Sequence, residues 1–308
     1  MEHCWLKAMA LLLLFLLSEA SRCPTECVGT YSNTYWKGIR GTERTIQLDS
    51  LYPSAKPPPP PPPVPFVLMI IQIQGGDIQT ANSLSYGSGR GTGNGYKNIG
   101  KAGLYEFVVV VSVGGGGNGY YEVTTEKTLD HEYSNEEANR FQAILVPFCN
   151  VAIIDNTTVI PAWDGSIGGV LAVLATTIRL GDVSLQGKGF RGGPFVNGFV
   201  DPGSYSYSFR DNSSSDVTKP FNGPKGEGFI GTPRFHLSKS TYPNELDCAS
   251  GAPGNAGGGG NFVDCGAGGG ANAGRGGDGR IWAKQFHQPG IGGDSVPTDA
   301  TSRLFLGM

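Results

Sequence analysis

The stretch Gly251-Ala-Pro-Gly-Asn-Ala-Gly-Gly-Gly-Gly-Asn-Phe-Val-Asp-Cys265 continues through Gly266–Gly279 to Ile281-Trp282 and is the part of the chain on which the fold depends. Glycine is its commonest residue, but Asn, Ala, Asp and Cys are interleaved with it, so it is not a monotonous linker. Glycine loses more backbone entropy on folding than any other residue. Such a stretch is therefore disordered unless its backbone packs closely against other backbone, and the rest of the sequence has to decide between the two.

The composition around this stretch is that of a chain able to form a core. The 308 residues include 49 glycines and 21 prolines, 39% of them are hydrophobic, and only 16% are charged. Global disorder needs high charge and low hydrophobicity, so it is not expected. The formal net charge of −3 gives no electrostatic reason to expect nucleic acid or an anionic membrane as a partner.

The N-terminus has the layout of a secretory signal peptide over residues 1–20. One lysine precedes the apolar run Ala8–Leu17, and Ser18-Glu19-Ala20 offers a small-x-small cleavage site. The run is too short to cross a membrane, and no later run reaches about eighteen apolar residues. The mature protein is therefore expected to be secreted and extracellular, with no membrane span.

Removal of the signal peptide leaves five cysteines in an oxidising compartment, where pairing is favoured. Cys248 and Cys265 bracket the first glycine run, and Cys23 and Cys27 could close a small loop. Cys149 is then left over, as a free thiol or as an intermolecular disulfide. The Cys23-x3-Cys27 spacing has no second Cys or His pair at the distance of a zinc finger, so no metal is expected.

The run Lys56-Pro57 through Pro63, followed by Val64-Pro65, predicts the main domain boundary. Polyproline adopts a stiff extended helix, so residues 57–65 are expected to be a spacer. The alternative is a ligand for a proline-binding groove. An N-terminal cysteine-containing segment (21–56) would precede the spacer, and a glycine-rich β domain (66–308) would follow it.

Short β-type runs without helical crossovers predict an all-β fold after the spacer. They are Phe66–Gln74, Leu104–Val113, Tyr120–Thr125, Phe141–Pro147, Asn150–Asp155, Gly168–Ala175, Ile178–Leu180 and Val183–Leu185. Their spacing fits a sandwich, a barrel or a stacked solenoid. The rise in glycine toward the C-terminus favours a β-helix or solenoid with a glycine-rich C-terminal layer, because stacked coils need tight corners; an irregular β-sandwich is the alternative.

No motif predicts a catalytic, cofactor-binding or metal-binding residue, so a non-enzymatic protein without a cofactor is expected. Gly187–Gly192 matches the dinucleotide pattern G-x-G-x-x-G, but no helical pattern follows it. Gly276-Gly-Asp-Gly279 is out of register with the calcium nonapeptide. The aspartates that could serve glycoside hydrolysis occur where turns are expected: Asp155, Asp164, Asp182 and Asp201.

Two sequons predict N-glycosylation if the host has a eukaryotic secretory pathway. Asn156-Thr-Thr158 and Asn212-Ser-Ser214 both lie in polar surroundings, as expected of surface loops.

Several blocks, in the same order throughout residues 66–307, resemble a known glycine-rich domain. They are Leu68–Asn82, Ser85-Tyr86, Asn98–Phe107, Ala162–Ala172, Gly187–Gly193, Lys225–Gly228, Gly251–Gly260 and Arg303–Gly307. The family is the glycine-rich, N-terminal module of large secreted bacterial surface proteins. The resemblance implies a β-helix-like module of adhesin or matrix type, with no catalytic residues to carry over.

The chain departs from that family at both ends. It stops at Gly307-Met308, where similar sequences continue, which indicates a truncated C-terminus or a module recruited as a stand-alone protein. Its cysteines, its proline run and its eukaryotic-looking signal peptide are its own. Together with the bracketing cysteines, the ordered blocks favour a packed glycine-rich layer over a disordered tail.

Two functions follow as hypotheses. The first is a structural or adhesive component of an extracellular surface or matrix, for which a skeletal or shell organic matrix is one setting. Its partners would be matrix or surface polysaccharides or proteins. The second is a β-helix protein that binds or cleaves a polysaccharide, which would require a groove with two carboxylates about 5–10 Å apart.

Overall fold

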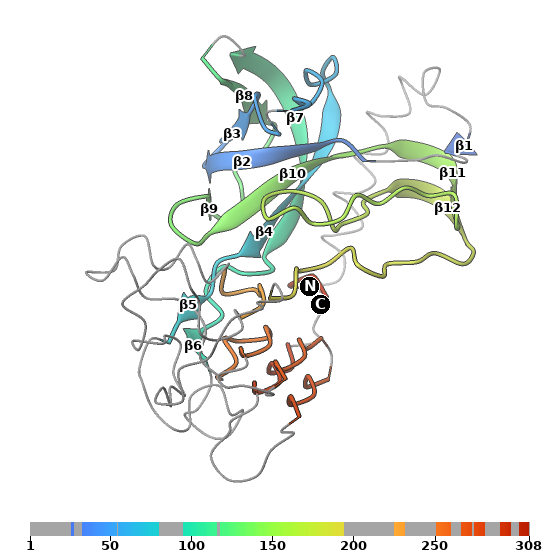
Figure 1. Ribbon diagram of the computed structural model, residues 1–308. Helices are drawn as coiled ribbons and strands as arrows, with labels where there is room; N and C mark the ends of the chain where they lie inside the picture. The colour runs from blue at the N-terminus through green and yellow to red at the C-terminus, as the bar shows by residue number, and fades with distance from the viewer. Residues whose placement is uncertain are drawn as a thin grey trace, which may run out of the picture. The chain divides into compact units, whose positions relative to one another are not determined.

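The computed structural model describes residues 26–27, 33–53, 55–79, 95–115, 118–193, 225–231, 251–259, 266–272, 274–280, 290–296 and 302–307 (Figure 1). These residues form twelve strands and no α-helix, so the predicted all-β class is confirmed. The strands are β1 (Glu26–Cys27), β2 (Tyr35–Thr42), β3 (Thr45–Asp49), β4 (Phe66–Gln74), β5 (Asp77–Ile78), β6 (Tyr96–Asn98), β7 (Tyr105–Gly115), β8 (Tyr120–Thr125), β9 (Tyr133–Ser134), β10 (Arg140–Val146), β11 (Phe148–Ile154) and β12 (Leu174–Leu180). None of the described residues belongs to a helix that could cross a membrane.

The chain divides into two compact units. The first takes in residues 1–33, 146–159 and 171–184, and the second takes in residues 34–145, 160–170 and 185–308. The first unit therefore holds β1, β11 and β12, and the barrel and the glycine-rich segments described below belong to the second.

Six strands of the second unit close into a barrel in the order β10-β4-β7-β8-β3-β2. The closing contact is the antiparallel pairing of β2 with β10, in which Trp36 lies opposite Ala143. The two-residue strand β9 is added to β2 opposite Arg40 and Gly41. A closed barrel pairs the edges that an open sheet would expose. The predicted β-helix is therefore wrong for this unit, and so is the alternative sandwich, because one sheet closes on itself.

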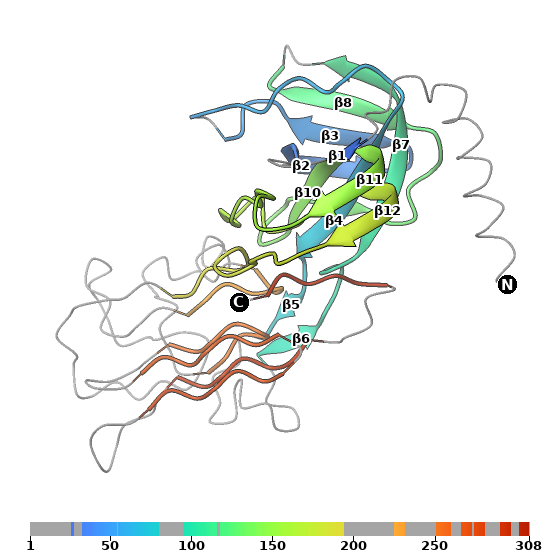
Figure 2. The same cartoon turned by 90° about the vertical axis from the view of Figure 1, so that its right-hand side faces the viewer.

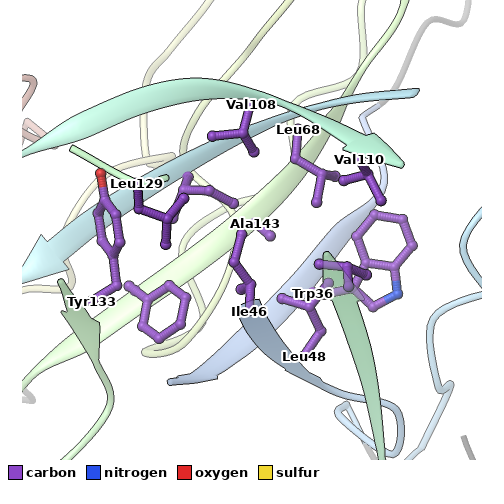
Figure 3. Close-up of a cluster of buried hydrophobic side chains, with 12 residues drawn as sticks. Trp36, Ile46, Leu48, Leu68, Val108, Val110, Leu129, Tyr133 and Ala143 are labelled. Atoms are coloured by element: carbon purple, nitrogen blue, oxygen red, sulfur yellow. The ribbon is translucent and has the colours of Figure 1, made fainter. Parts of the chain in front are cut away.

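The barrel core follows the two-residue period of its strands (Figure 3). In β3, Ile46 and Leu48 are buried while their neighbours are only partly buried, and Ile46 lies opposite Val123 of β8. Successive side chains of a strand point to opposite faces, so each barrel strand contributes every second residue to the interior. The other core residues are Trp36, Leu68, Ile70, Val108, Val110, Leu129, Tyr133, Phe141 and Ala143.

The proline run joins two strands of this one barrel. It connects β3 to β4, and the strands on either side of it, β2 and β3 before and β4 onward after, belong to the same closed sheet. The residues of the run are exposed or half-buried. The domain boundary expected at residues 57–65 is therefore not where the chain divides, because residues 34–145 form one continuous part of the second unit.

The parallel strand pairings among the described residues all lie in the first unit. β1 pairs with β11, and β11 pairs with β12 from Phe148 opposite Leu174 to Ile154 opposite Leu180. The buried Asn33 amide holds Ala172 from both sides, since its Nδ2 donates to the Ala172 carbonyl (2.7 Å) and its Oδ1 accepts from the Ala172 N–H (3.0 Å). The stacked parallel strands expected of a solenoid are thus limited here to a three-stranded sheet.

Candidate functional site

Four segments of the second unit, extended except for a turn at Pro253–Ala256, form a bundle and contain no strand or helix. We call them rod 1 (residues 251–259), rod 2 (266–272), rod 3 (274–280) and rod 4 (290–296). Figure 2 shows them in orange to red, running side by side. They include most of the glycine-rich stretch from Gly251 to Trp282.

Rods 2 and 4 are held together by backbone hydrogen bonds at every third residue. The N–H groups of Gly290, Gly293 and Val296 donate to the carbonyls of Gly266, Gly269 and Asn272, at 2.8–2.9 Å. A period of three is that of the polyproline II helix, which has three residues per turn and no internal hydrogen bonds. Because every N–H and C=O of such a helix points outward, neighbouring rods are needed to satisfy those that are buried.

The residue numbers of the hydrogen-bond donors and acceptors give the relative direction of the rods. Along rods 2 and 4 they rise together, so these two rods are parallel, and every other bonded pair is antiparallel. Rods 1 and 3 each bond to both rods 2 and 4, which makes two triangles of rods that share the 2–4 side. The bonds of the outer rods are Gly258 N to Ile291 O, Asp294 N to Gly254 O, Gly268 N to Gly258 O, Ala271 N to Asn255 O, Gly266 N to Arg280 O, Gly269 N to Gly277 O, Gly276 N to Gly293 O and Gly279 N to Gly290 O.

Steric exclusion explains why glycine occupies the inner positions of the rods. At seven of them a Cβ atom would lie under 3.0 Å from the carbonyl oxygen of a neighbouring rod, a separation that real Cβ atoms essentially never show: Gly257, Gly268, Gly276, Gly279, Gly290, Gly292 and Gly293. The outer positions differ, because a Cβ on Gly274 or Gly277 would meet nothing within 4 Å. Close backbone packing is thus the alternative to disorder that the chain adopts.

Asn255 and a small apolar cluster anchor the bundle inside the second unit. The fully buried Asn255 accepts a hydrogen bond from the Phe229 N–H (2.9 Å) and donates to the Ala271 carbonyl (3.4 Å). Phe229 makes edge contacts with the rings of Tyr96 (5.2 Å) and Phe305 (5.8 Å), and the cluster also contains Val296 of rod 4. Asn255 of rod 1 therefore joins Phe229 to rod 2, and this contact fixes the position of the bundle in the second unit.

Four charged side chains lie on rods 3 and 4: Arg275, Asp278, Arg280 and Asp294. A guanidinium nitrogen of Arg275 lies 2.7 Å from Asp278 Oδ1, which also accepts the Gly292 N–H at 2.7 Å. Burial raises the pKa of Asp294, while Arg275 acts in the opposite direction. Asp294 Oδ2 is buried and has no hydrogen-bond partner. The Arg275–Asp278 pair therefore stabilises the rods, and the unpaired Asp294 oxygen opposes them. Within the described residues no cluster of His, Cys, Asp and Glu could hold a metal ion.

A second polar cluster forms where several of the recognisable blocks meet. Glu227 receives Arg191 through Nε (2.9 Å), through a terminal guanidinium nitrogen (2.6 Å) and through its backbone N–H (3.1 Å). The Glu227 side chain is 6% exposed and that of Arg191 is 51% exposed. The blocks meet by backbone contacts as well, from Trp163 N–H to the Lys188 carbonyl and from Phe190 N–H to the Gly307 carbonyl.

The nearby Tyr52 and Asp164 make a turn and not an acid-base pair. Asp164 Oδ1 accepts the N–H groups of Ser166 and Ile167, and its Oδ2 accepts the Tyr52 hydroxyl (3.1 Å). Burial raises the pKa of Tyr52, so its proton is held more firmly than usual. The arrangement satisfies hydrogen bonds of the loop and leaves no activated nucleophile.

An open cavity of about 300 Å³ lies beside β2 and β9 of the barrel. Its lining carries Arg40, Lys101, Glu132 and Glu136, and Lys101 pairs with Glu132 at 3.4 Å. With both signs of charge balanced in one shallow space, it has no field that would select an ionic ligand.

The cysteines are only partly covered by the described residues. Cys149 is buried and disulfide-bonded in the single chain, so the free thiol or intermolecular bond expected for it is wrong. Cys27 lies in β1, opposite Ala152 of β11. Cys23, Cys248 and Cys265 lie outside the described residues, as do the residues of the signal peptide.

Peptide mapping of the unreduced protein identifies the partner of Cys149.

The remaining sites of the sequence analysis are dispersed. Asn156 is exposed in the turn that Asp155 and Thr158 close, and Asn212 lies outside the described residues. The Thr157 hydroxyl and N–H lower the pKa of Asp155. Gly187–Gly192 lies in irregular structure that begins at a turn, and the described residues stop at Gly193, so the expected lack of a helix after it stays a prediction. Asp182 lies in the first unit, and Asp201 is outside the described residues.

Sequence reasoning missed how the rods pair, although a signal was present. Glycines recur at a spacing of three in Gly266 and Gly269, Gly276 and Gly279, and Gly290 and Gly293. This is the period of the polyproline II helix, and not the two-residue period that predicts strands.

No protein-family model matches the chain, and no curated protein matches it with significant sequence similarity.

Proposed function

We propose that this protein is a secreted, non-enzymatic structural or adhesive component of an extracellular surface or matrix. The observation that carries the proposal is the bundle of four rods, which packs backbone against backbone and keeps rods 2 and 3 largely exposed. A surface built in this way presents rigid main chain and few side chains, which suits cohesion better than chemistry on a small substrate. The resemblance to the glycine-rich module of bacterial surface proteins, and the predicted signal peptide, support the same role.

The polysaccharide-active alternative lacks the scaffold that it requires. It required a groove along stacked coils, and the second unit is a closed barrel with a rod bundle. The Glu227 carboxylate, the most buried one near a loop cluster, is held on both oxygens by Arg191. A carboxylate paired in this way is not poised as a general acid.

Fractionation of the native source tests the proposal. Mass spectrometry of the soluble, wall-bound and insoluble fractions should find the protein in the insoluble or wall-bound material. Recombinant protein added to that material should be retained, and the Gly276→Ala variant, whose new Cβ would collide with the Gly269 carbonyl, should be retained less than Gly277→Ala. Recovery in the soluble fraction alone, with no retention, would overturn the proposal.

A further inference from the structure

Rod 3 has an exposed edge that no described residue pairs. Its N–H groups at Gly274, Arg275, Gly277, Asp278 and Arg280 donate to nothing in the described part of the chain, and these residues are the exposed ones of the rod. Gly276 and Gly279, which donate to rod 4, are half-buried. Exposure thus follows the same period of three as the hydrogen bonds, and one side of the rod faces solvent as the edge strand of a sheet does.

Two glycines on this edge have no steric reason inside the chain to be glycine. A Cβ on Gly274 or Gly277 would meet nothing within 4 Å, whereas a Cβ on Gly276 or Gly279 would collide with rod 2. Glycine there still destabilises the folded chain relative to alanine. What it permits is the close approach of another backbone, which is the role that glycine has at every inner contact of the bundle.

We propose that rod 3 is a self-association edge, on which a second copy of this chain adds its own rod 3 in antiparallel orientation about a twofold axis. The bundle itself shows that a rod pairs with another rod, and rod 3 already forms antiparallel pairs with rods 2 and 4. A twofold contact uses the same patch on both copies, so the patch must complement itself.

The charges and the hydrogen-bonding groups of rod 3 meet that condition at one register. With the axis between Gly276 and Gly277, Arg275 faces Asp278 of the second copy, and Asp278 faces its Arg275. Within one chain these two side chains already pair with each other at 2.7 Å, but both are about half exposed, at 44% and 52%, and so can also reach a second copy. In the same register the backbone N–H and C=O groups of Arg275 and Asp278, which bond to nothing in the described part of the chain, lie opposite one another on the two copies.

Such pairing deepens the proposed structural role and rests on it, because a cohesive component gains from joining copies through an edge that adds rods. Sedimentation velocity of the full chain over a concentration series tests it in solution. We expect the wild type to pass from monomer to dimer as concentration rises. Gly277→Leu should raise the dimer Kd by at least about a hundredfold, because its side chain enters space that only the second copy would fill.

Gly192→Leu is the matched control, since Gly192 is also exposed with nothing within 4 Å of its Cβ position and lies outside the rods. It should leave the Kd unchanged, and both variants should keep the thermal midpoint of the wild type. Arg275→Asp should raise the Kd about tenfold by placing like charges opposite each other, and adding Asp278→Arg should restore it.

A wild type that stays monomeric at every concentration overturns the inference, and so does a dimer that Gly277→Leu does not weaken. A monomer that is still retained by the insoluble matrix would leave the proposed function standing and remove only the twofold edge. A dimer that the insoluble matrix does not retain would keep the twofold edge and overturn the proposed function.

Discussion

Gly276 and Gly277 are neighbours on rod 3 with opposite steric surroundings. The first faces the Gly269 carbonyl of rod 2 and the second faces open space. The backbone φ of neither is positive, so both positions accept the conformation of an L-residue and differ only in room. This makes them a matched pair for separating packing from glycine's entropy.

Gly276→Ala is therefore expected to destabilise the bundle by about 1–3 kcal/mol through overpacking. Gly277→Ala should change the stability by no more than about 0.5 kcal/mol, and in the favourable direction, because alanine restricts the unfolded chain. Hydrogen exchange of the amides in residues 266–280 measures both. Equal acceleration in the two variants would mean that the rods are not close-packed.

Asp294 is the residue whose charge opposes the bundle. Burial raises its pKa, and its Oδ2 lacks a partner. A carboxyl whose pKa is raised by folding contributes its full stability below the unfolded pKa, where it is protonated in both states. That contribution is lost as the pH rises through the folded pKa.

Asp294→Asn should then raise the free energy of unfolding at pH 7, by less than about 1 kcal/mol, since Asn has no charge to desolvate. The difference between variant and wild type should shrink as the pH falls toward the ordinary pKa of an aspartate. Urea denaturation between pH 7 and pH 4 measures it, with the exposed neighbour Ser295→Ala as control. A difference that grows on acidification would show that Asp294 is stabilised as the anion.

At the scale of elements, the barrel depends on the pairing of β2 with β10. Gly38 of β2 lies under the ring of Phe141, so that a Cβ there would come under 3.0 Å from three ring carbons. The β2–β3 register also shifts between Gly38 and Arg40. The ring fills the space that a side chain at position 38 would need, and this lets β2 close the sheet.

Gly38→Ala should cost about 1–3 kcal/mol by overpacking, and Phe141→Ala about 3–5 kcal/mol by loss of a buried ring. The double variant should cost less than the sum by at least about 1 kcal/mol, because the new methyl enters the space left by the ring. Urea denaturation of the four proteins gives the coupling. Gly114→Ala on β7, where the nearest atom is 3.9 Å away, should be nearly neutral; additive costs would mean that the ring and Gly38 do not share one space.

The elements that local pattern could reveal are those with strong apolar or alternating runs. The predictions of Phe66–Gln74 and Tyr120–Thr125 coincide with β4 and β8. β2 was missed, because its Gly, Lys and Arg residues hide the alternation that buries Trp36. The closure of the barrel was not predictable, since Trp36 and Ala143 meet across more than a hundred residues and no local signal records that pairing.

At the scale of the whole molecule, the chain enters and leaves its two units repeatedly. Residues 146–159 and 171–184 of the first unit alternate with residues 160–170 of the second. Composition placed the boundary at the proline run because stiff, extended runs usually join domains. Here the order of segments along the sequence differs from their order in space. The rods lie in the last third of the chain, whose composition alone would also have allowed a disordered tail.

The position of the proline run inside the barrel leads to a test of the whole cooperative unit. Replacing Pro57–Pro63 by seven Gly and Ser residues keeps the length of the β3–β4 connection and removes its stiffness. Since the two strands belong to one closed sheet, the added freedom of the unfolded chain should lower the free energy of unfolding, by up to about 0.4–1 kcal/mol for each proline replaced.

The expected result is a lower urea midpoint with an unchanged far-ultraviolet circular dichroism spectrum. If the run were a spacer between independent domains, its flexibility would leave the unfolding of residues 66–308 unaffected, and an unchanged midpoint would therefore restore the boundary that composition predicted. A partner that the wild type binds and the variant loses, with the midpoint unchanged, would instead mark the run as a ligand for a proline-binding groove.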